Sequence, residues 1–373
     1  MKRIILAIAA ITAIAACTKS EVTYEAPGEI GFNVVAGNIT KAPATGTAMP
    51  EGLNMYVNAY VQDDAIPTAP DYINNGEFTK RTNQVNSTNV WGGVTPYYWP
   101  NAQKLHFSGY SKSGNFLSVE EGQPTPSASY DPSTDKLTIT NYTPGESTGL
   151  GANDLMWFPS TKYVESEGYG KSTPFVPVQM YHTCSWLTFM VQGDETTGGT
   201  NSTYKITSLK INDLDLTANV TCTGATASSL SADALKDYVD WTIDEEPAGV
   251  YEVAVYEGGI ELKSTCVKPN DASTPTLQPK NVEKNNGNTN EGNVVVIPQT
   301  PGTIDIEWTY KSSTGADITD SATRLPLDGT SNVQSWEPGK HYIYTITLKA
   351  NEILIAPTPV TWADQTGGSV TVE

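Results

Sequence analysis

Residue types that carry chemistry are scarce in this sequence of 373 residues, which has only three histidines and four cysteines. It contains no HExxH pattern, no CxxC pair and no phosphate-binding P-loop. Asp213 and Asp215 could contact calcium, but they lack the glycine and the distal glutamate of a calcium loop. The histidines all fall inside strand-like patterns, where a packed position is the simpler interpretation: His106, His182 and His341. We therefore predict a protein that is not an enzyme and holds no cofactor or metal.

Basic residues are also few, because 22 Lys and Arg stand against 41 Asp and Glu, giving a formal net charge of −19. Electrostatic attraction does not draw such an acidic chain to nucleic acid or to an anionic membrane. The acidic residues are scattered along the sequence, as expected of a solvated surface. Nucleic acid is therefore excluded as an expected partner.

Long hydrophobic runs are missing beyond the first 16 residues. There, Lys2 and Arg3 precede a short apolar run from Ile4 to Ala13, a pattern typical of an export signal and too short to span a membrane stably. The run ends in Ile14-Ala-Ala-Cys17, which resembles the lipobox of bacterial lipoproteins. We predict that residues 1–16 are removed and that Cys17 carries the fatty acyl chains that anchor the protein outside the cytoplasm.

Disulfide bonds can contribute little to this fold. Once Cys17 is assigned to lipid, Cys184, Cys222 and Cys266 remain, and three cysteines cannot all pair. At most one disulfide can form, and the sequence leaves its pairing open. A chain of this length can bury a large core without such cross-links.

The segment from Glu29 to Lys41 follows the predicted anchor directly. Ile30, Phe32 and Val34 alternate with Gly31, Asn33 and Val35, the period of a strand with one buried face. A turn-rich tract then begins at Lys41-Ala42, and such a tract leaves a lysine accessible to a protease. Residues 17–41 are thus expected to form a lipidated segment with a strand that a cut can release. The simpler interpretation is an ordinary first strand followed by a loop.

The remainder of the chain is strand-like, which predicts an all-β fold of two antiparallel β-sandwiches, at residues 42–172 and 173–373. The polar stretch 62–89 lacks apolar periodicity and is expected to be a surface loop, and 160–173 is expected to connect the two domains. Residues 176–191 are strand-like, and the last part of this stretch, with apolar residues on both faces, is expected to be a central strand. The only stretch with helical character is 231–239. The clearest strands are expected at 53–61, 105–110, 137–140, 206–211, 293–298, 304–310 and 342–348.

Several segments together resemble the fimbrillin family of Bacteroidales, the subunits of type V pili. The similar segments run in order along the mature chain: Tyr98-Trp-Pro100 before Leu105–Tyr110, Asp154-Leu-Met-Trp157, Val178–Phe189, Val295–Thr300, Trp336–Leu348 and Val360-Thr-Trp362. The resemblance implies transthyretin-like sandwiches, an outer-membrane lipoprotein precursor and, after processing, a place in an extracellular fimbrium.

The resemblance also implies a mode of assembly. A trypsin-like protease removes the lipid together with the first strand, and a strand of another subunit, of the same or a different kind, fills the groove. The cut maps onto Lys41-Ala42, although the best-known members have arginine there. The expected donor is the C-terminal segment, with Val360 and Trp362 and, beyond Gly367-Gly368, Val370 and Val372. The alternative for Val360 to Trp362 is that they simply complete the second sandwich.

Two other functions remain open. Trp91, Tyr97, Tyr98 and Trp99 lie among glycine and proline, and exposed rings of this kind could stack on sugars of a host or bacterial surface. The chain would then be a surface glycan-binding lipoprotein. It could also be a fimbrial anchor that does not polymerise and keeps its lipid and first strand. The sequence does not distinguish a stalk, a tip and an anchor subunit.

Overall fold

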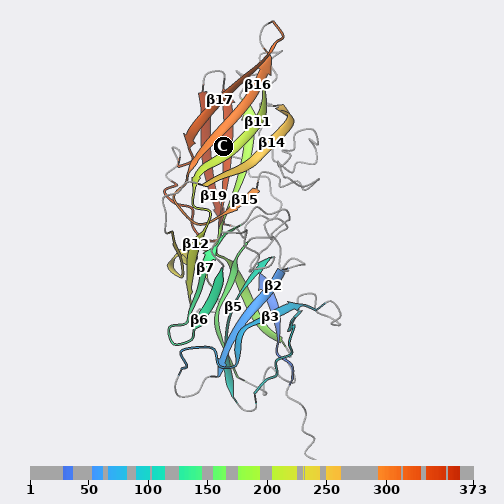
Figure 1. The fold of residues 1–373 in the computed structure, drawn as a ribbon, viewed down its shortest axis with the longest axis vertical. Helices are drawn as coiled ribbons and strands as arrows, with labels where there is room; N and C mark the ends of the chain where they lie inside the picture. Colours follow the sequence, from blue (N-terminus) through green and yellow to red (C-terminus); the bar gives the residue numbers. More distant parts are fainter. Residues whose placement is uncertain are drawn as a thin grey trace, which may run out of the picture.

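The computed structural model describes residues 28–36, 53–61, 66–81, 90–100, 103–113, 126–144, 154–164, 175–193, 204–224, 230, 232–243, 249–261, 293–311, 314–328, 333–349 and 352–361. Their regular structure is all β-strand apart from one 3-10 helix, η1 (Ala232–Asp237). This helix falls within the segment predicted to be helical. No helix in these ranges is long and apolar enough to cross a membrane. The all-β fold class is confirmed, and the molecule is elongated (Figure 1).

Seven strands form a closed barrel in the first half of the molecule, in the order β1-β4-β3-β2-β5-β8-β9. Its interior is filled by alternate side chains of each strand, including Phe32, Phe78, Phe107 and Phe158. Such closure leaves no strand edge free, which is why a barrel is a stable way to end a sheet. The strands are β1 (Gly31–Ala36), β2 (Leu53–Val61), β3 (Ile73–Lys80), β4 (Val90–Gly93), β5 (Lys104–Ser113), β8 (Met156–Val164) and β9 (Phe175–His182).

Strand β3 lies where the sequence predicted a surface loop, so that prediction was wrong for residues 73–80. Ile73 and Phe78 point into the barrel, but the one buried position between them is occupied by Gly76. Asn75 has a positive φ of 51°, and the pairing with β2 shifts register nearby. A glycine and an irregularity therefore hid the period of two on which the sequence argument depended.

A four-stranded sheet packs on the outside of the barrel, in the order β13-β12-β7-β6. Its inner residues share a second core with outward-facing aromatic residues of the barrel strands, such as Tyr60, Tyr110 and Trp157. Two of its strands come from the region after residue 200, so the chain returns to the first half after it has left the barrel. The strands are β6 (Ser127–Asp131), β7 (Lys136–Tyr142), β12 (Ala218–Thr223) and β13 (Val239–Thr242).

Two more four-stranded sheets form the other half of the molecule, with a third core between them. One has the order β15-β10-β18-β19 and the other β14-β11-β16-β17, and the strands of the second are labelled at the upper end of Figure 1. Side chains of both sheets, among them Phe189, Ile211 and Tyr344, belong to this core, so the two sheets pack as a sandwich. The strands are β10 (Ser185–Gly193), β11 (Tyr204–Leu214), β14 (Gly249–Glu261), β15 (Asn293–Val296), β16 (Thr303–Lys311), β17 (Asp317–Pro326), β18 (Lys340–Lys349) and β19 (Glu352–Thr361).

The sheets do not divide at residue 172. Strand β9, which follows that position, belongs to the barrel, and β12 and β13 join the sheet of β6 and β7. The stretch 176–191 forms two strands, β9 in the barrel and β10 in the sandwich, separated by Thr183 and Cys184. Its last part, β10, lies between β15 and β18, as predicted for a central strand. Both strands are rich in apolar residues, and periodicity alone could not locate the change of sheet. The tandem transthyretin-like arrangement stays a prediction.

Candidate functional site

Strand β1 lies between β4 and β9 and closes the barrel (Figure 1 gives the barrel at the lower end). It pairs in parallel with β9 at six positions, from Gly31 opposite Phe175 to Ala36 opposite Met180. On its other side it pairs antiparallel with β4 at three positions, with Phe32 opposite Trp91. This strand is therefore bonded along both edges, as an interior strand of a sheet is.

The inward side chains of this segment fill the centre of the barrel. Ile30, Phe32 and Val34 are each 0% exposed. The ring of Phe32 meets those of Phe78 and Phe107 edge-on, with centroids 5.1 Å and 5.3 Å away. Aromatic pairs prefer this geometry, and burial of three apolar side chains contributes roughly 1.5–3 kcal/mol each. The first strand thus holds a share of the core comparable with the typical net stability of a domain, about 5–15 kcal/mol.

The residues just before β1 are fixed to the turn after β4. The amide of Ile30 donates to the Tyr97 carbonyl (2.7 Å), and the amide of Trp99 donates to the Gly28 carbonyl (3.1 Å). Arg81 forms an ion pair with Glu29 at 2.7 Å, with both side chains 41% exposed. An exposed pair of this kind contributes at most about 1 kcal/mol. The backbone bonds and the core therefore hold this end more than the ion pair does.

Strand β9 depends on β1 for much of its pairing. Within the described residues, β8 pairs with β9 only at His182 and Tyr181, so β1 is the strand partner of Phe175 to Met180. The inward residues of that stretch, Val176, Val178 and Met180, lie in the same core as Phe32. Loss of β1 would therefore leave Phe175 to Met180 of β9 without a paired strand. It would also leave β4 paired on one edge only, with β3.

Strand β19 is the counterpart at the far end of the sequence. It lies at the edge of its sheet and pairs antiparallel with β18 at ten positions, with Val360 opposite His341. Pro357 and Pro359 are two residues apart, so their nitrogens point to the same side of the strand and donate no hydrogen bond there. Proline is confined to such edges because an interior strand needs donors on both sides.

Several predicted site residues lie outside the described residues. These are Cys17, Lys41, Ala42, Trp362, Val370 and Val372. The structure therefore describes the predicted removable strand and one of the four predicted donor residues, Val360. The predicted lipidation site and the predicted cleavage site are both among the residues outside it.

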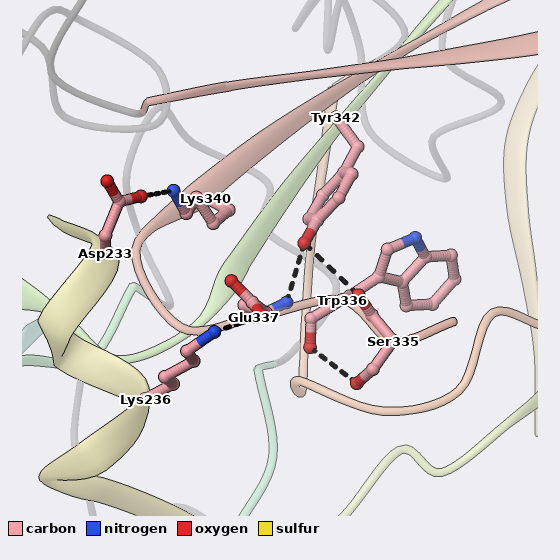
Figure 2. Close-up of polar contacts among 7 residues, drawn as sticks. All are labelled: Asp233, Lys236, Ser335, Trp336, Glu337, Lys340 and Tyr342. Atoms are coloured by element: carbon pink, nitrogen blue, oxygen red, sulfur yellow. Dashed lines mark hydrogen bonds and ion pairs between the residues drawn. The ribbon is translucent and has the colours of Figure 1, made fainter. Parts of the chain in front are cut away.

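The two halves meet at a turn that precedes β18 (Figure 2). Glu337 forms an ion pair with Lys236 of η1 at 3.2 Å, and Lys340 forms an ion pair with Asp233 of the same helix. The backbone amide of Glu337 donates to the Tyr342 hydroxyl at 2.8 Å. These contacts join η1, which is attached to the sheet on the barrel, to the sandwich.

Glycine is required at one position of this turn. Gly339 has φ of +67°, and an added Cβ would lie 2.5 Å from Cδ1 of Leu235 on η1. Its amide donates to the Cys184 carbonyl at 2.9 Å, between β9 and β10. The turn therefore touches both the helix and the point where the chain passes from barrel to sandwich.

Two of the segments that carry the family resemblance meet in a buried side-chain contact. Nδ1 of His182 lies 2.5 Å from Oδ2 of Asp154, with side chains 7% and 0% exposed. The next residue, Thr183, donates to the Leu155 carbonyl through both its amide (2.9 Å) and its hydroxyl (2.8 Å). This contact fixes the start of β8 to the end of β9. The contact therefore gives both segments a structural role. The sequence identified the two segments separately and did not predict that they touch.

Other candidate sites contain structural contacts. All three histidines are buried, and the described residues hold no group of three or more His, Cys, Asp or Glu side chains that could bind a metal. The Asp213 carboxylate accepts from Thr303 at 2.7 Å and from Arg324 at 2.8 Å. These hydrogen bonds, that of Thr303 first, lower the pKa of Asp213. Gly145-Glu-Ser-Thr-Gly149 has the GxSxG spacing of serine hydrolases, but it lies outside the described residues.

The four aromatic residues proposed as a sugar platform do not share one surface. Trp91 and Trp99 are 1% and 2% exposed and lie in the barrel core. Tyr97 stacks on Phe78 with centroids 5.8 Å apart. Only Tyr98 of the four is largely exposed, at 49%. These rings mainly pack the barrel next to the start of β1.

The fold is thus that of an all-β protein whose first strand completes a barrel and whose last described strand lies at a sheet edge. The model of the fimbrillin-like protein family matches residues 40–362, and the chain belongs to this family. No curated protein matches the chain at a significant level.

Solved structures provide two further comparisons. A fimbrial protein from Bacteroides vulgatus is 14% identical, with 90% of this chain and 99% of that one covered and a TM-score of 0.53. A fimbrial assembly protein from Parabacteroides distasonis is 10% identical, with coverage of 90% and 98% and a TM-score of 0.39. At such low identity the first comparison supports the fold alone.

Proposed function

We propose that this protein is a structural and adhesive subunit of a fimbrium, exported as an outer-membrane lipoprotein through Cys17 and assembled by protease-triggered strand exchange. Membership of the fimbrillin-like family supports a pilus or adhesion role at the cell surface. The observation that carries the assembly step is that Phe32 and Val34 of β1, and Ile30 just before it, are fully buried, and that β1 is bonded on both edges.

The groove left by β1 would be costly to keep empty. Its loss would expose the apolar interior of the barrel and the unpaired backbone groups of β4 and β9. A new strand with alternating apolar side chains would restore both burial and hydrogen bonds, which is the driving force of β-strand addition. A removable interior strand therefore supplies the free energy for polymerisation.

A cut at Lys41 suits this mechanism better than one at the other basic pair. Lys41 follows the end of β1 at Ala36 by a few residues, so cleavage separates the whole first strand from the rest of the chain. In contrast, Lys80 pairs with Trp91, and the amide of Arg81 donates to the Val90 carbonyl at 2.8 Å. A protease needs an extended, accessible backbone, and this pair is held in a ladder.

The donor belongs to the C-terminal segment, which has two parts. Val360 is paired with β18 within its own subunit, so it can donate only if that part of β19 leaves the sheet. Pro357 and Pro359 would leave two positions without a donor if β19 became an interior strand elsewhere. The residues after Thr361 contain no proline, so we assign donation mainly to the part with Val370 and Val372.

The test begins with the N-terminal residue and the lipid content of protein sheared from intact cells, determined by intact mass and N-terminal sequencing. We expect a lipid-free chain that begins at Ala42 and migrates in polymers of high mass. A Lys41→Ala variant should stay at full mature length, remain membrane-bound and fail to enter polymers. Lys80→Ala, in the ladder-bound pair, is the matched control and should assemble normally.

Other outcomes would assign a different role. An acylated Cys17 on a monomeric chain at the membrane would exclude strand exchange and leave a fimbrial anchor or a glycan-binding lipoprotein. A glycan array probed with that monomer would then separate these two functions. Cleavage at Lys41 without polymers would show that processing occurs but that the groove takes no partner.

A further inference from the structure

The groove of β1 is selective for the size of the residue at its centre. Phe32 lies opposite Trp91 on one side and Val176 on the other, and its ring is surrounded by those of Phe78 and Phe107. The ring of Phe158 is also near, with its centroid 6.2 Å away. Protein cores are packed at crystal-like density, so a smaller side chain here would leave a cavity. The central position therefore requires an aromatic side chain.

The position before the centre requires a small residue. Gly31 lies opposite Phe175, and a Cβ added to Gly31 would be 2.8 Å from that ring and 3.2 Å from the Trp91 carbonyl oxygen. The flanking inward positions, Ile30 and Val34, are 0% exposed and apolar. An occupant therefore needs three alternating apolar residues, an aromatic in the middle and a small residue over Phe175.

The chain's own C-terminal segment does not meet this requirement. Trp362 is the only aromatic residue after β18, and its neighbours at two residues' distance are Val360 and Asp364. Whichever way the strand runs, placing Trp362 at the Phe32 position puts Asp364 into a fully apolar pocket, where an unpaired carboxylate is strongly disfavoured. With Val370 or Val372 at the centre, the aromatic pocket is left partly empty.

The geometry points to a different subunit, not a second copy of this chain, as the strand donor for this groove. This inference rests on the proposed strand exchange and specifies its partner: a subunit whose donor strand has bulky apolar residues at three alternate positions, an aromatic in the middle and glycine or another small residue over Phe175. The chain's own C-terminal segment, with two valines, then suits the groove of another subunit with smaller central residues. This protein therefore stands at a junction between unlike subunits.

The experiment uses the mature chain with a site for a sequence-specific protease inserted after Lys41. The protein is cut in the presence of an excess of one labelled peptide, gel-filtered and analysed by native mass spectrometry for the peptide retained. The peptides are residues 28–36, the same peptide with Phe32→Val, the same with Gly31→Val, and residues 360–373. Adding the peptide during cutting keeps the groove occupied, so aggregation of an open barrel does not obscure the result.

We expect the 28–36 peptide to replace the original strand, and the Phe32→Val peptide to bind about tenfold more weakly because it fills the pocket less well. The Gly31→Val peptide and the 360–373 peptide should bind more weakly still. If the 360–373 peptide binds as tightly as 28–36, the requirement for a different subunit is overturned while strand exchange stands. If the first strand stays bound after cutting and no peptide replaces it, strand exchange itself fails, and this inference fails with it.

Discussion

Strands β1 and β19 are both rich in apolar residues but have opposite surroundings. The first is bonded on both edges, and its inward residues Phe32 and Val34, like Ile30 just before it, are 0% exposed. The other is bonded only to β18, and Ile355 is half-buried against the third core, between the two sheets of the sandwich. The same kind of segment is therefore essential in one half of the molecule and peripheral in the other.

Under the proposed strand exchange, the difference determines which strand can drive assembly. An edge strand can leave with the loss of one ladder and part of one face, whereas loss of an interior strand opens a core. A subunit that loses an interior strand exposes a large apolar surface at its groove, so binding of a new strand there is strongly favourable. Release of its own edge segment costs less free energy, because fewer contacts are broken. Mutations in the two strands should therefore lower the free energy of unfolding by different amounts.

The largest effect is expected from Phe32→Ala, which removes the ring at the centre of the barrel. Truncation of a buried aromatic residue destabilises by about 3–5 kcal/mol, because transfer free energy and packing are both lost. Urea unfolding of the uncut protein, followed by circular dichroism, measures the change. Asn33→Ala, on the exposed face of the same strand, should stay within about 0.5 kcal/mol. Equal effects of the two variants would contradict the interior position of β1.

Gly31→Val tests the close approach of Phe175 on the outer face of the barrel. The new side chain would meet a ring that lies 2.8 Å from its Cβ, and overpacking of this kind destabilises by about 1–3 kcal/mol. Asn33→Val adds the same side chain to the same face, where there is space, and serves as the control. The double variant Gly31→Val with Phe175→Ala should regain most of the loss, and an additive result would exclude this contact.

Acidification should weaken the sheet that holds β19. Burial lowers the pKa of His341 to about 3, so the folded protein keeps this ring neutral while the unfolded chain protonates it below about pH 6.5. The unfolded state therefore binds more protons, and stability falls as the pH drops from 6.5 towards 3. From pH 6.5 to 5 the contribution lost is about 2 kcal/mol. Unfolding free energies of the wild type and His341→Gln at both pH values measure it, and parallel profiles would contradict the assignment.

The smallest effect is expected from Ile355→Ala in β19. The side chain is half-buried, so its truncation should cost about 1 kcal/mol, less than the 2–5 kcal/mol or so expected for Ile30→Ala in the first segment. The two variants delete the same atoms, which makes the pair a direct comparison of edge and interior. Urea unfolding of both proteins provides the measurement. A cost for Ile355→Ala equal to that of Ile30→Ala would remove the distinction between the strands.

Much of the β-structure could be predicted from periodicity, and the exceptions have physical causes. The regular alternation at Leu53–Val61 predicted β2 with the same bounds. Strand β3 was missed because Gly76 occupies a buried position and Asn75 interrupts the register. The change from β9 to β10 was missed because both strands are apolar, and only their partners differ.

The candidate site was predictable only in part. Alternation identified Ile30, Phe32 and Val34 as one face of a strand, and the structure buries all three. The pairing of β1 between β4 and β9 joins residues far apart in the sequence, and nothing local encodes it. The same holds for His182 and Asp154, which sequence reasoning treated as parts of separate segments.

The sequence by itself determined the all-β class, the shortage of catalytic residues and the inward face of the first strand, because composition and a period of two are local properties. Only the tertiary structure decided that this strand closes a barrel, that β12 and β13 return to the first half, and that β19 lies at an edge. Strand pairing is set by contacts between distant segments, whose free energy depends on the whole arrangement of the core. Two apolar segments could therefore become an interior strand at one end of the chain and an edge strand at the other.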